Sequence, residues 1–287
     1  MTPQDYDFLR GFLKERSGLV LSNDKQYLIE SRLMPVARTV GLDSVSALVA
    51  HLRTPLGRVA GEKVVEAMTT NESFFFRDKT PFDHFSNVMM PHLLEARRNQ
   101  RKIRIWCAAA STGQEPYSLA MIIKDMGLKT SAFRFDILGT DISKEVLERA
   151  RAGTYTQFEA QRGLPIQMLL DHFQQKGETW EISPAIRQMV QYRPFNLFDS
   201  FASLGTFDIV FVRNVLIYFE QDAKVQILER IAKQMAPDAY MVLGAAETVV
   251  GLTDAFKAVP GARGLYQPNV EQSTRAPAPA FSALRTA

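Results

Sequence analysis

The sequence predicts an α/β domain built around a largely parallel sheet, with a smaller all-helical domain in front of it. Residues 1–70 show only helical periodicity in their apolar positions. Further along, short apolar runs alternate with helical stretches, which is the pattern of parallel strands joined by helices. The first of these runs ends in a group of small residues followed by a helix start, as in doubly wound sheets.

The N-terminal part is interpreted as a series of helices. Each combines apolar residues at helical spacing with residue types that favour helix starts or ends. The expected helices run from about Phe8 to Gly18, from a cap at Asn23 or Asp24 to Gly41, from Asp43 through Leu52, and from about Arg58 to Met68.

The strands of the α/β part are expected at five short apolar runs. These are Ile103–Ala108, Phe135–Thr140, Met189–Arg193, Phe207–Val212 and Tyr240–Gly244. Trp180 and Ile182 alternate with polar residues as in a half-buried strand, and Lys176–Gly177 supplies a tight turn before them. The Pro/Ala-rich stretch 268–287 shows no such pattern and is interpreted as a mobile tail.

The composition is ordinary for a globular chain, with 46% hydrophobic residues and a net charge of +3, so nucleic acid is not an expected partner. Cys107 is the only cysteine, which excludes an internal disulfide and fits a reducing, cytoplasmic compartment. The N-terminus does not resemble a signal peptide, and no apolar run approaches the ~18 residues of a membrane span. The four histidines lack metal-ligand spacing, so no metal site is predicted.

The segment RIWCAAASTGQEPYSLAM (104–121) predicts a ligand pocket. The small residues Ala108–Gly113 let a ligand approach the backbone, and a helix with free N–H groups starts near Pro116. A tight turn without a ligand is the alternative. The next strand ends in Asp141, where a carboxylate can accept hydrogen bonds from two ribose hydroxyls. Asp141 alone could instead cap a helix, a role for which Ser143 competes.

Six motifs that follow one another along the chain together resemble a known protein family. They are TTNESFFFRD (69–78), WCAAASTGQEPYSLA (106–120), GTDIS (139–143), FNLFD (195–199), FDIVFVRNVLIYF (207–219) and LGAAET (243–248). Together they resemble the CheR-type chemotaxis protein-glutamate O-methyltransferases over roughly residues 5–267. The resemblance implies S-adenosylmethionine as cofactor and S-adenosylhomocysteine as product.

The resemblance also implies a domain order. Residues 1–70 would form a helical domain that docks the receptor, and 71–85 a linker that contributes to the cofactor site. Residues 86–267 would form a Rossmann-like S-adenosylmethionine-dependent methyltransferase domain, with a small β-subdomain at about 170–193.

The family's site residues carry over position by position. The implied cofactor-binding residues are Asn71, Ser73, Arg77, Glu115, Asp141, Asn196, Leu197, Arg213 and Asn214. Glu115 would meet the methionine amino group and Asp141 the ribose, whereas Asn196 and Leu197 would lie beside the adenine. Arg77 and Tyr218 are the implied catalytic residues.

Three departures from the family pattern concern polar groups. Ser73 stands where threonine is common, although it keeps the hydroxyl. Gln114 replaces the first of two usual glutamates, which leaves Glu115 to supply the charge. GAAE at 244–247 replaces the more usual GHSE, so hydrogen bonding at its two middle positions is in question.

Methyl transfer to glutamate needs little acid–base chemistry. A sulfonium methyl is already activated and a glutamate carboxylate is ionised at pH 7, so in-line displacement needs no metal and no general base. Alignment can supply up to ~7–11 kcal/mol. Arg77 can hold a carboxylate through two N–H groups, and Tyr218 can fix its orientation. The alternatives are an arginine that is solvated or paired with Glu72 or Asp78, and a core tyrosine.

The partner follows from the same resemblance. Receptor methylation regions in this family are acidic helical bundles, so a basic helix face is expected to dock them. Lys25 and Arg32 share such a face, with Arg38 near its edge. The Lys176–Gly177 turn is shorter than in members that bind a pentapeptide at the receptor C-terminus. We therefore expect no dependence on that peptide, no insertion into the membrane, and a monomer.

Three other functions are weighed against this one. A methyltransferase for a small molecule or RNA would fit the pocket, but would give the N-terminal helices no role. A non-catalytic signalling scaffold is disfavoured because the charged and phenolic site residues are intact. A nicotinamide-dependent dehydrogenase lacks the GxGxxG spacing.

Overall fold

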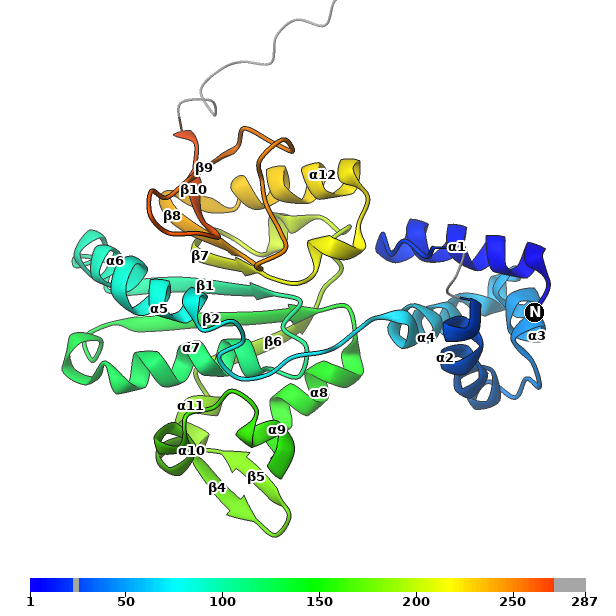
Figure 1. Ribbon diagram of the computed structural model, residues 1–287, viewed down its shortest axis with the longest axis horizontal. Coiled ribbons are helices and arrows are strands. Elements are labelled where there is room, and N and C mark those ends of the chain that lie inside the picture. Colours follow the sequence, from blue (N-terminus) through cyan, green and yellow to red (C-terminus); the bar gives the residue numbers. More distant parts are fainter. Residues whose placement is uncertain (23–25, 271–287) are drawn as a thin grey trace, which may run out of the picture.

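The computed structural model describes residues 1–22 and 26–270, which form a helical N-terminal domain and a larger α/β domain (Figure 1). The predicted fold class is confirmed. The N-terminal domain consists of α1 (Pro3–Ser17), α2 (Gln26–Thr39), α3 (Val45–Leu52), the 3-10 turn η1 (Pro55–Gly57) and α4 (Arg58–Met68). A single extended segment leads from α4 to the α/β domain (Figure 1).

The N-terminal helices pack around a core of their own. Leu9 of α1, Leu33 of α2, Leu48 of α3 and Val64 of α4 are fully buried in one cluster. Their burial follows from helical spacing, which turns the apolar residues of each helix to one side. Gly18 ends α1 in the left-handed conformation, with a φ of 70°.

The start of α3 corrects one prediction. Ser44, rather than Asp43, caps this helix, and its Oγ accepts the Ala47 N–H at 3.1 Å. The residue directly before the first helical position is the one whose side chain reaches the third N–H of the helix. The caps predicted for α2, Asn23 or Asp24, lie outside the described residues.

The α/β domain begins with a helical stretch that packs on the sheet: α5 (Thr80–His84), the π-helical η2 (Phe85–Met89) and α6 (Met90–Ala96). The elements up to the small sheet are β1 (Lys102–Ala108), α7 (Gln114–Asp125), η3 (Gly127–Lys129), β2 (Arg134–Asp141), α8 (Lys144–Ala152), β3 (Thr154–Thr156), α9 (Gln157–Gln161), α10 (Ile166–His172), β4 (Phe173–Lys176), β5 (Thr179–Ile182) and α11 (Pro184–Arg187). The remainder is β6 (Val190–Pro194), η4 (Phe201–Ser203), β7 (Phe207–Val212), η5 (Leu216–Tyr218), α12 (Gln221–Ala232), β8 (Met235–Leu243), β9 (Phe256–Ala258) and β10 (Leu265–Pro268).

The main sheet has the order β6-β2-β1-β7-β8-β10-β9. The first five of these strands are parallel and overlap the five predicted apolar runs, although β8 begins at Met235, before the predicted Tyr240; β10 and β9 are antiparallel additions. After β1 the chain adds β2 and then β6 on one side of β1, and it then returns to add β7 on the other side. This reversal lies between β1 and β7, and ligands bind beside such a point at the carboxyl ends of the strands.

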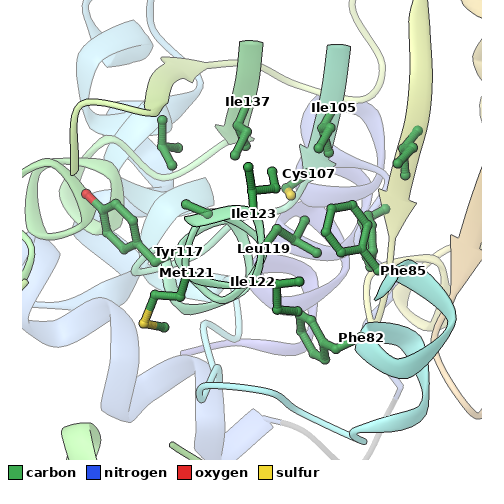
Figure 2. Packing of buried hydrophobic residues seen from close by; sticks show 14 of the residues in the cluster. Phe82, Phe85, Ile105, Cys107, Tyr117, Leu119, Met121, Ile122, Ile123 and Ile137 are labelled. Atoms are coloured by element: carbon green, nitrogen blue, oxygen red, sulfur yellow. The ribbon is translucent and has the colours of Figure 1, made fainter. Parts of the chain in front are cut away.

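One face of the sheet is covered by α7, whose apolar residues lie under β1 and β2 (Figure 2). Leu119 and Ile123 of α7 pack with Ile105, Cys107 and Ile137 in one buried cluster. Cys107 is fully buried, and burial raises the pKa of its thiol. Each large apolar side chain in such a core contributes roughly 1.5–3 kcal/mol. None of the described helices is long and apolar enough to cross a membrane.

The small β-subdomain differs from its expected range of about 170–193. Its sheet has the order β3-β5-β4 and begins earlier, at Thr154. The stretch 190–194 instead pairs with β2 in the main sheet. The expected hairpin is present, and its two-residue turn is Gly177–Glu178, one position later than predicted. A three-residue strand such as β3 is too short to show alternation in the sequence.

Candidate active site

All ten residues predicted for the site line one hollow at the carboxyl ends of the parallel strands. They are Asn71, Ser73, Arg77, Glu115, Asp141, Asn196, Leu197, Arg213, Asn214 and Tyr218. The linker after α4, the start of α7, the end of β2 and the turns after β6 and β7 supply them. Residues distant in the sequence therefore meet beside the strand-order reversal.

Asp141 ends β2 and binds the turn after β1. Its Oδ2 accepts the Ser111 N–H at 2.9 Å and its Oδ1 accepts the Ser143 N–H at 3.0 Å. Ser143 caps α8 by accepting the Val146 N–H, so Asp141 is not the helix cap. Burial raises the pKa of the Asp141 carboxyl, although the backbone N–H groups oppose the rise. Each carboxylate oxygen keeps a lone pair for a ligand hydroxyl.

The turn after β1 is strained. Ala109 and Ser111 have φ values of 58° and 51°, in the left-handed region that non-glycine residues rarely adopt. A side chain at Gly113 would place its Cβ 2.6 Å from the Tyr192 hydroxyl, so only glycine fits there. Each strained residue costs on the order of 1–3 kcal/mol, and such residues concentrate at ligand sites. The Ser111 hydroxyl joins this turn to the linker by donating to the Asn71 carbonyl at 2.9 Å.

Arg213 is the central charge of the hollow, with a side chain that is 2% exposed. Its Nη1 lies 2.7 Å from Glu115 Oε2, and its Nη2 lies 2.8 Å from Asp78 Oδ2. Nη2 also donates to the Arg77 carbonyl at 2.7 Å. The Nε is buried and has no hydrogen-bond partner among residues 1–22 and 26–270. An unpaired buried donor costs about 1–3 kcal/mol, and a ligand acceptor can satisfy it.

Glu115 supplies a carboxylate at the start of α7. Burial raises the pKa of the Glu115 carboxyl, and the Arg213 guanidinium opposes that rise. The neighbouring Gln114 is buried, and its Oε1 accepts the Thr112 hydroxyl at 2.8 Å. The neutral Gln114 therefore leaves a single negative charge at the helix start, as the sequence suggested.

The linker bends sharply around Arg77. Phe76, Asp78 and Lys79 have φ values of 52°, 68° and 47°, so three of its near neighbours adopt positive φ values that non-glycine residues rarely show. The bend is fixed at Phe76, whose N–H donates to the Ser118 hydroxyl on α7 at 3.1 Å. Strain held in this way by surrounding contacts is consistent with a functional segment.

Arg77 forms no salt bridge in the described part of the chain. Its Nη1 donates to the Glu72 carbonyl at 2.9 Å. The Glu72 carboxylate pairs with Arg162 at 2.6 Å. Asp78 pairs with Arg213, as described above. Both carboxylates considered for a salt bridge with Arg77 are therefore bound by other arginines.

Tyr218 is half-buried at the end of η5 and lines the hollow. Its hydroxyl makes no hydrogen bond within residues 1–22 and 26–270. Its backbone is held from two sides, because its N–H donates to the Val215 carbonyl and its carbonyl accepts the Val20 N–H, both at 3.2 Å. The backbone of Tyr218 is thus held while its hydroxyl is free to bind a ligand, which is not the arrangement of a core tyrosine.

One wall of the hollow was missed by the sequence analysis. Ser17 and Leu19, on the turn after α1, line it from the N-terminal domain. The Asn196 Nδ2 donates to the Arg16 carbonyl at 2.7 Å, which fastens the end of α1 to the α/β domain. A Cβ at Gly18 would lie 2.2 Å from the ring of Phe198, the second phenylalanine of the FNLFD motif. Gly18 was the only signal, and it was interpreted as a helix end alone.

The lining fits a ligand that carries ribose, an aromatic base and an amino acid. Asp141 can accept from hydroxyls, and Glu115 can accept from an ammonium group. Phe195 and Leu197 offer an apolar surface after β6. These groups bind and orient such a ligand, while Arg77 and Tyr218 can hold a second, anionic group at the same hollow.

Comparison with known proteins agrees with this geometry. Residues 4–69 match the all-alpha domain of the CheR methyltransferases, and residues 71–265 match their S-adenosylmethionine binding domain. The chain is 42% identical over 266 residues to chemotaxis protein methyltransferase 1 of Pseudomonas aeruginosa, covering 91% of this chain and 96% of the relative. It is 33% identical over 247 residues to the chemotaxis protein methyltransferase of Escherichia coli, covering 84% and 83%. The chain therefore belongs to the CheR methyltransferase family, and S-adenosylmethionine is its cofactor.

Proposed function

We propose that this chain transfers the methyl group of S-adenosylmethionine to glutamate side chains of chemotaxis receptors. Tyr218, whose hydroxyl makes no hydrogen bond in the described chain, and Arg77, which forms no salt bridge there, line the same hollow and carry the proposal, because a phenol and a guanidinium suit an incoming carboxylate. The similar proteins of Pseudomonas aeruginosa and Escherichia coli, which are named as chemotaxis protein methyltransferases, support a receptor as the substrate.

The residues of this chain act mainly by alignment. The cofactor supplies an electrophilic methyl group, and a glutamate carboxylate is a nucleophile without losing a proton at pH 7. Asp141 and Glu115 orient the cofactor, while Arg77 and Tyr218 orient the carboxylate. Holding the two reactants in line is the contribution that such a site can make.

The docking surface requires one correction. Arg32 does not offer a free cation, because its Nη1 donates to the Met68 and Thr69 carbonyls at 3.0 and 2.9 Å. It thereby caps the carboxyl end of α4, where the linker begins. Lys25 lies outside the described residues. Arg38 on α2 is exposed and remains available for docking.

A second hollow supports docking on this side of the molecule. It lies between α2 and α4 on one side and α8 and α9 on the other, and shares Asn71, Glu72 and Ser73 with the cofactor hollow. Lys63 of α4 lines it and is exposed, with no ion pair among the described residues. A receptor helix in this groove would bring its glutamate toward the linker. We include Lys63 with Arg38 in the docking surface.

Charge reversal tests this docking. Arg38→Glu with Lys63→Glu should raise the Michaelis constant for receptor, with a larger effect at low salt. Lys124→Glu with Lys129→Glu makes the same change in charge on exposed lysines at the far end of α7 and beyond. Equal Michaelis constants for the two double variants at low salt would refute the docking role.

The β-subdomain supports independence from a receptor pentapeptide. β4 is an edge strand to which a peptide could add. Its turn to β5 is only Gly177–Glu178, so few side chains are available to select a peptide. Titration with a pentapeptide of the NWETF type should show no binding, while S-adenosylhomocysteine still binds. Micromolar affinity for the peptide would contradict this part of the proposal.

The substrate is tested by offering alternatives. The purified enzyme is incubated with methyl-labelled S-adenosylmethionine and either a receptor cytoplasmic domain or RNA. Label should enter the receptor as a base-labile ester, and should be lost when the receptor's methylatable glutamates are replaced by alanine. Label in RNA, or in the alanine-substituted receptor, would favour another substrate.

A further inference from the structure

Two loops meet at the carboxyl edge of the sheet, and one carboxylate binds both. The loop after β7 carries Arg213, Asn214 and Tyr218. The loop after β8 carries Glu247, the last residue of the GAAE motif, which was given no role by the sequence analysis. Glu247 is half-buried and faces the start of η5.

The Glu247 carboxylate accepts four backbone N–H groups. Its Oε2 accepts from Asn214 and Gly244, both at 2.8 Å. Its Oε1 accepts from Val215 at 3.0 Å and from Leu216 at 2.8 Å. Three of the donors are consecutive residues of the β7 loop, so this one side chain satisfies the free amides at the start of η5.

The backbone around the Glu247 carboxylate is shaped to hold it closely. Asn214 has a φ of 59°, which turns successive N–H groups toward one point. A Cβ at Gly244 would lie 2.7 Å from Glu247 Oε2 and 3.0 Å from the Asn214 nitrogen. Glycine at 244 is therefore required for this close approach. The two alanines between Gly244 and Glu247 are exposed.

The backbone that Glu247 holds is hydrogen-bonded in turn to Tyr218. The Tyr218 N–H donates to the carbonyl of Val215, whose own N–H is held by Glu247. We propose that Glu247 is a positioning residue, which fixes the β7 loop so that the Tyr218 hydroxyl stands at the methyl-transfer position. This inference rests on the proposed function of Tyr218.

Glu247→Gln tests the inference, because an amide keeps the size but places an NH₂ group against backbone donors. Turnover on receptor should fall by about tenfold or more, as a small misplacement in a site can cause. Cofactor affinity should fall less than turnover. Backbone amides of 214–216 should exchange hydrogen for deuterium faster. Glu229→Gln makes the same change at an exposed position of α12 and should alter none of these quantities.

A double-mutant cycle separates positioning from general stability. If Glu247 acts through Tyr218, then Tyr218→Phe should lower turnover much less in the Glu247→Gln background than in the native chain. Multiplicative effects, or unchanged amide exchange at 214–216, would overturn the inference. Gly244→Ala, which displaces the carboxylate by contact, should reproduce the faster exchange.

The remaining outcomes are also decisive. If neither Glu247→Gln nor Gly244→Ala yields folded protein, Glu247 has a general structural role and the inference is wrong. If the native chain fails to methylate receptor, the proposed function fails, whereas the amide-exchange result still decides whether Glu247 holds the loop.

Discussion

Two buried arginines lie at opposite ends of the parallel strands of the main sheet, and their hydrogen-bond partners differ. Below, the two ends of the strands are called the amino edge and the carboxyl edge of the sheet. Arg97, which follows α6, lies at the amino ends of β1 and β7 and is 9% exposed. Its Nε bonds Asp208 at 2.8 Å, while Nη1 and Nη2 hold Asp238 at 2.8 and 2.6 Å. Asp208 in turn accepts the Arg104 N–H at 2.7 Å. Each guanidinium nitrogen of Arg97 has a partner, and the network joins three strands.

Arg213, at the carboxyl ends of the strands, is 5% exposed as a whole residue, and its side chain is 2% exposed. It shares its partners with a strained linker, and its Nε has no partner in the described chain. A fully paired network fixes one arrangement, whereas a network with an unpaired donor can change partners when a ligand enters. The comparison indicates that one edge of the sheet stabilises the fold and that the other binds ligand at some cost in stability.

The largest expected effect is on stability at the amino edge. Arg97→Met leaves Asp208 and Asp238 without their cation, and should lower the free energy of unfolding by about 3–5 kcal/mol. Affinity for S-adenosylhomocysteine should stay within about twofold, because the two edges share no partners. Urea unfolding and calorimetric titration measure the two quantities. If folded Arg97→Met protein lost much of its affinity for S-adenosylhomocysteine, the amino edge would not be independent of the ligand site, and the comparison would be wrong.

The matching change at the carboxyl edge should reverse the pattern. Arg213→Met should weaken S-adenosylhomocysteine binding by about tenfold or more, because charge-assisted contacts are lost. Its unfolding free energy should fall less than that of Arg97→Met. The pKa of Glu115 is already raised by burial, so this carboxyl can take up a proton when its partner is removed. Equal stability losses in the two variants would remove the contrast between the edges.

A smaller effect is expected at Asp141. Asp141→Ala should cost on the order of 1–3 kcal/mol of cofactor affinity, because it removes acceptors for the ribose. Ser143→Ala is the matched control, since it removes the cap of α8 and leaves the Asp141 carboxylate in place. The control should lose about 0.5–2 kcal/mol of stability without losing affinity. Unchanged affinity in Asp141→Ala would refute ribose binding.

The smallest effect is a difference in pH dependence. Arg97 lowers the pKa of Asp238 below 3.8, so the stability from this pair is present above pH 3.8 and is lost as the pH falls through the lowered value. Burial raises the pKa of Asp141 above 3.8 and that of Glu115 above 4.5. These two carboxyls therefore take up protons at higher pH. Cofactor affinity should decline on acidification before the Asp238 contribution to stability does, and the reverse order would contradict the account.

The apolar patterns predicted the fold well because they report burial directly. The run that became β7 is continuous because this central parallel strand is covered on both faces, and all six of its residues are buried. The run that became the edge strand β6 mixes apolar and polar residues, and only Val190 of that strand is buried. The motifs predicted ten residues that line one hollow, since strand ends at one sheet edge meet whatever their separation in sequence. β3 was missed because three residues carry no periodicity.

Partners between distant side chains and backbone could not be predicted. Arg32 was interpreted as a docking cation from its place on a helix face, yet it binds carbonyls at the end of α4. Glu247 was seen only as part of a motif, because its four donors come from two loops brought together by β7 and β8. The turn at Ser17 and Leu19 meets the hollow only through the packing of the two domains.

The central claim is that the carboxyl edge transfers a methyl group to receptor glutamate, with Tyr218 orienting the acceptor. The most direct measurement is methyl-ester formation on a receptor cytoplasmic domain by the native chain and by Tyr218→Phe. Both are saturated with S-adenosylmethionine, and the modified residues are located by mass spectrometry. The account predicts glutamate methyl esters from the native chain and a rate lower by about tenfold or more in the folded variant. Absence of esters from the native chain, or an equal rate in Tyr218→Phe, would contradict it.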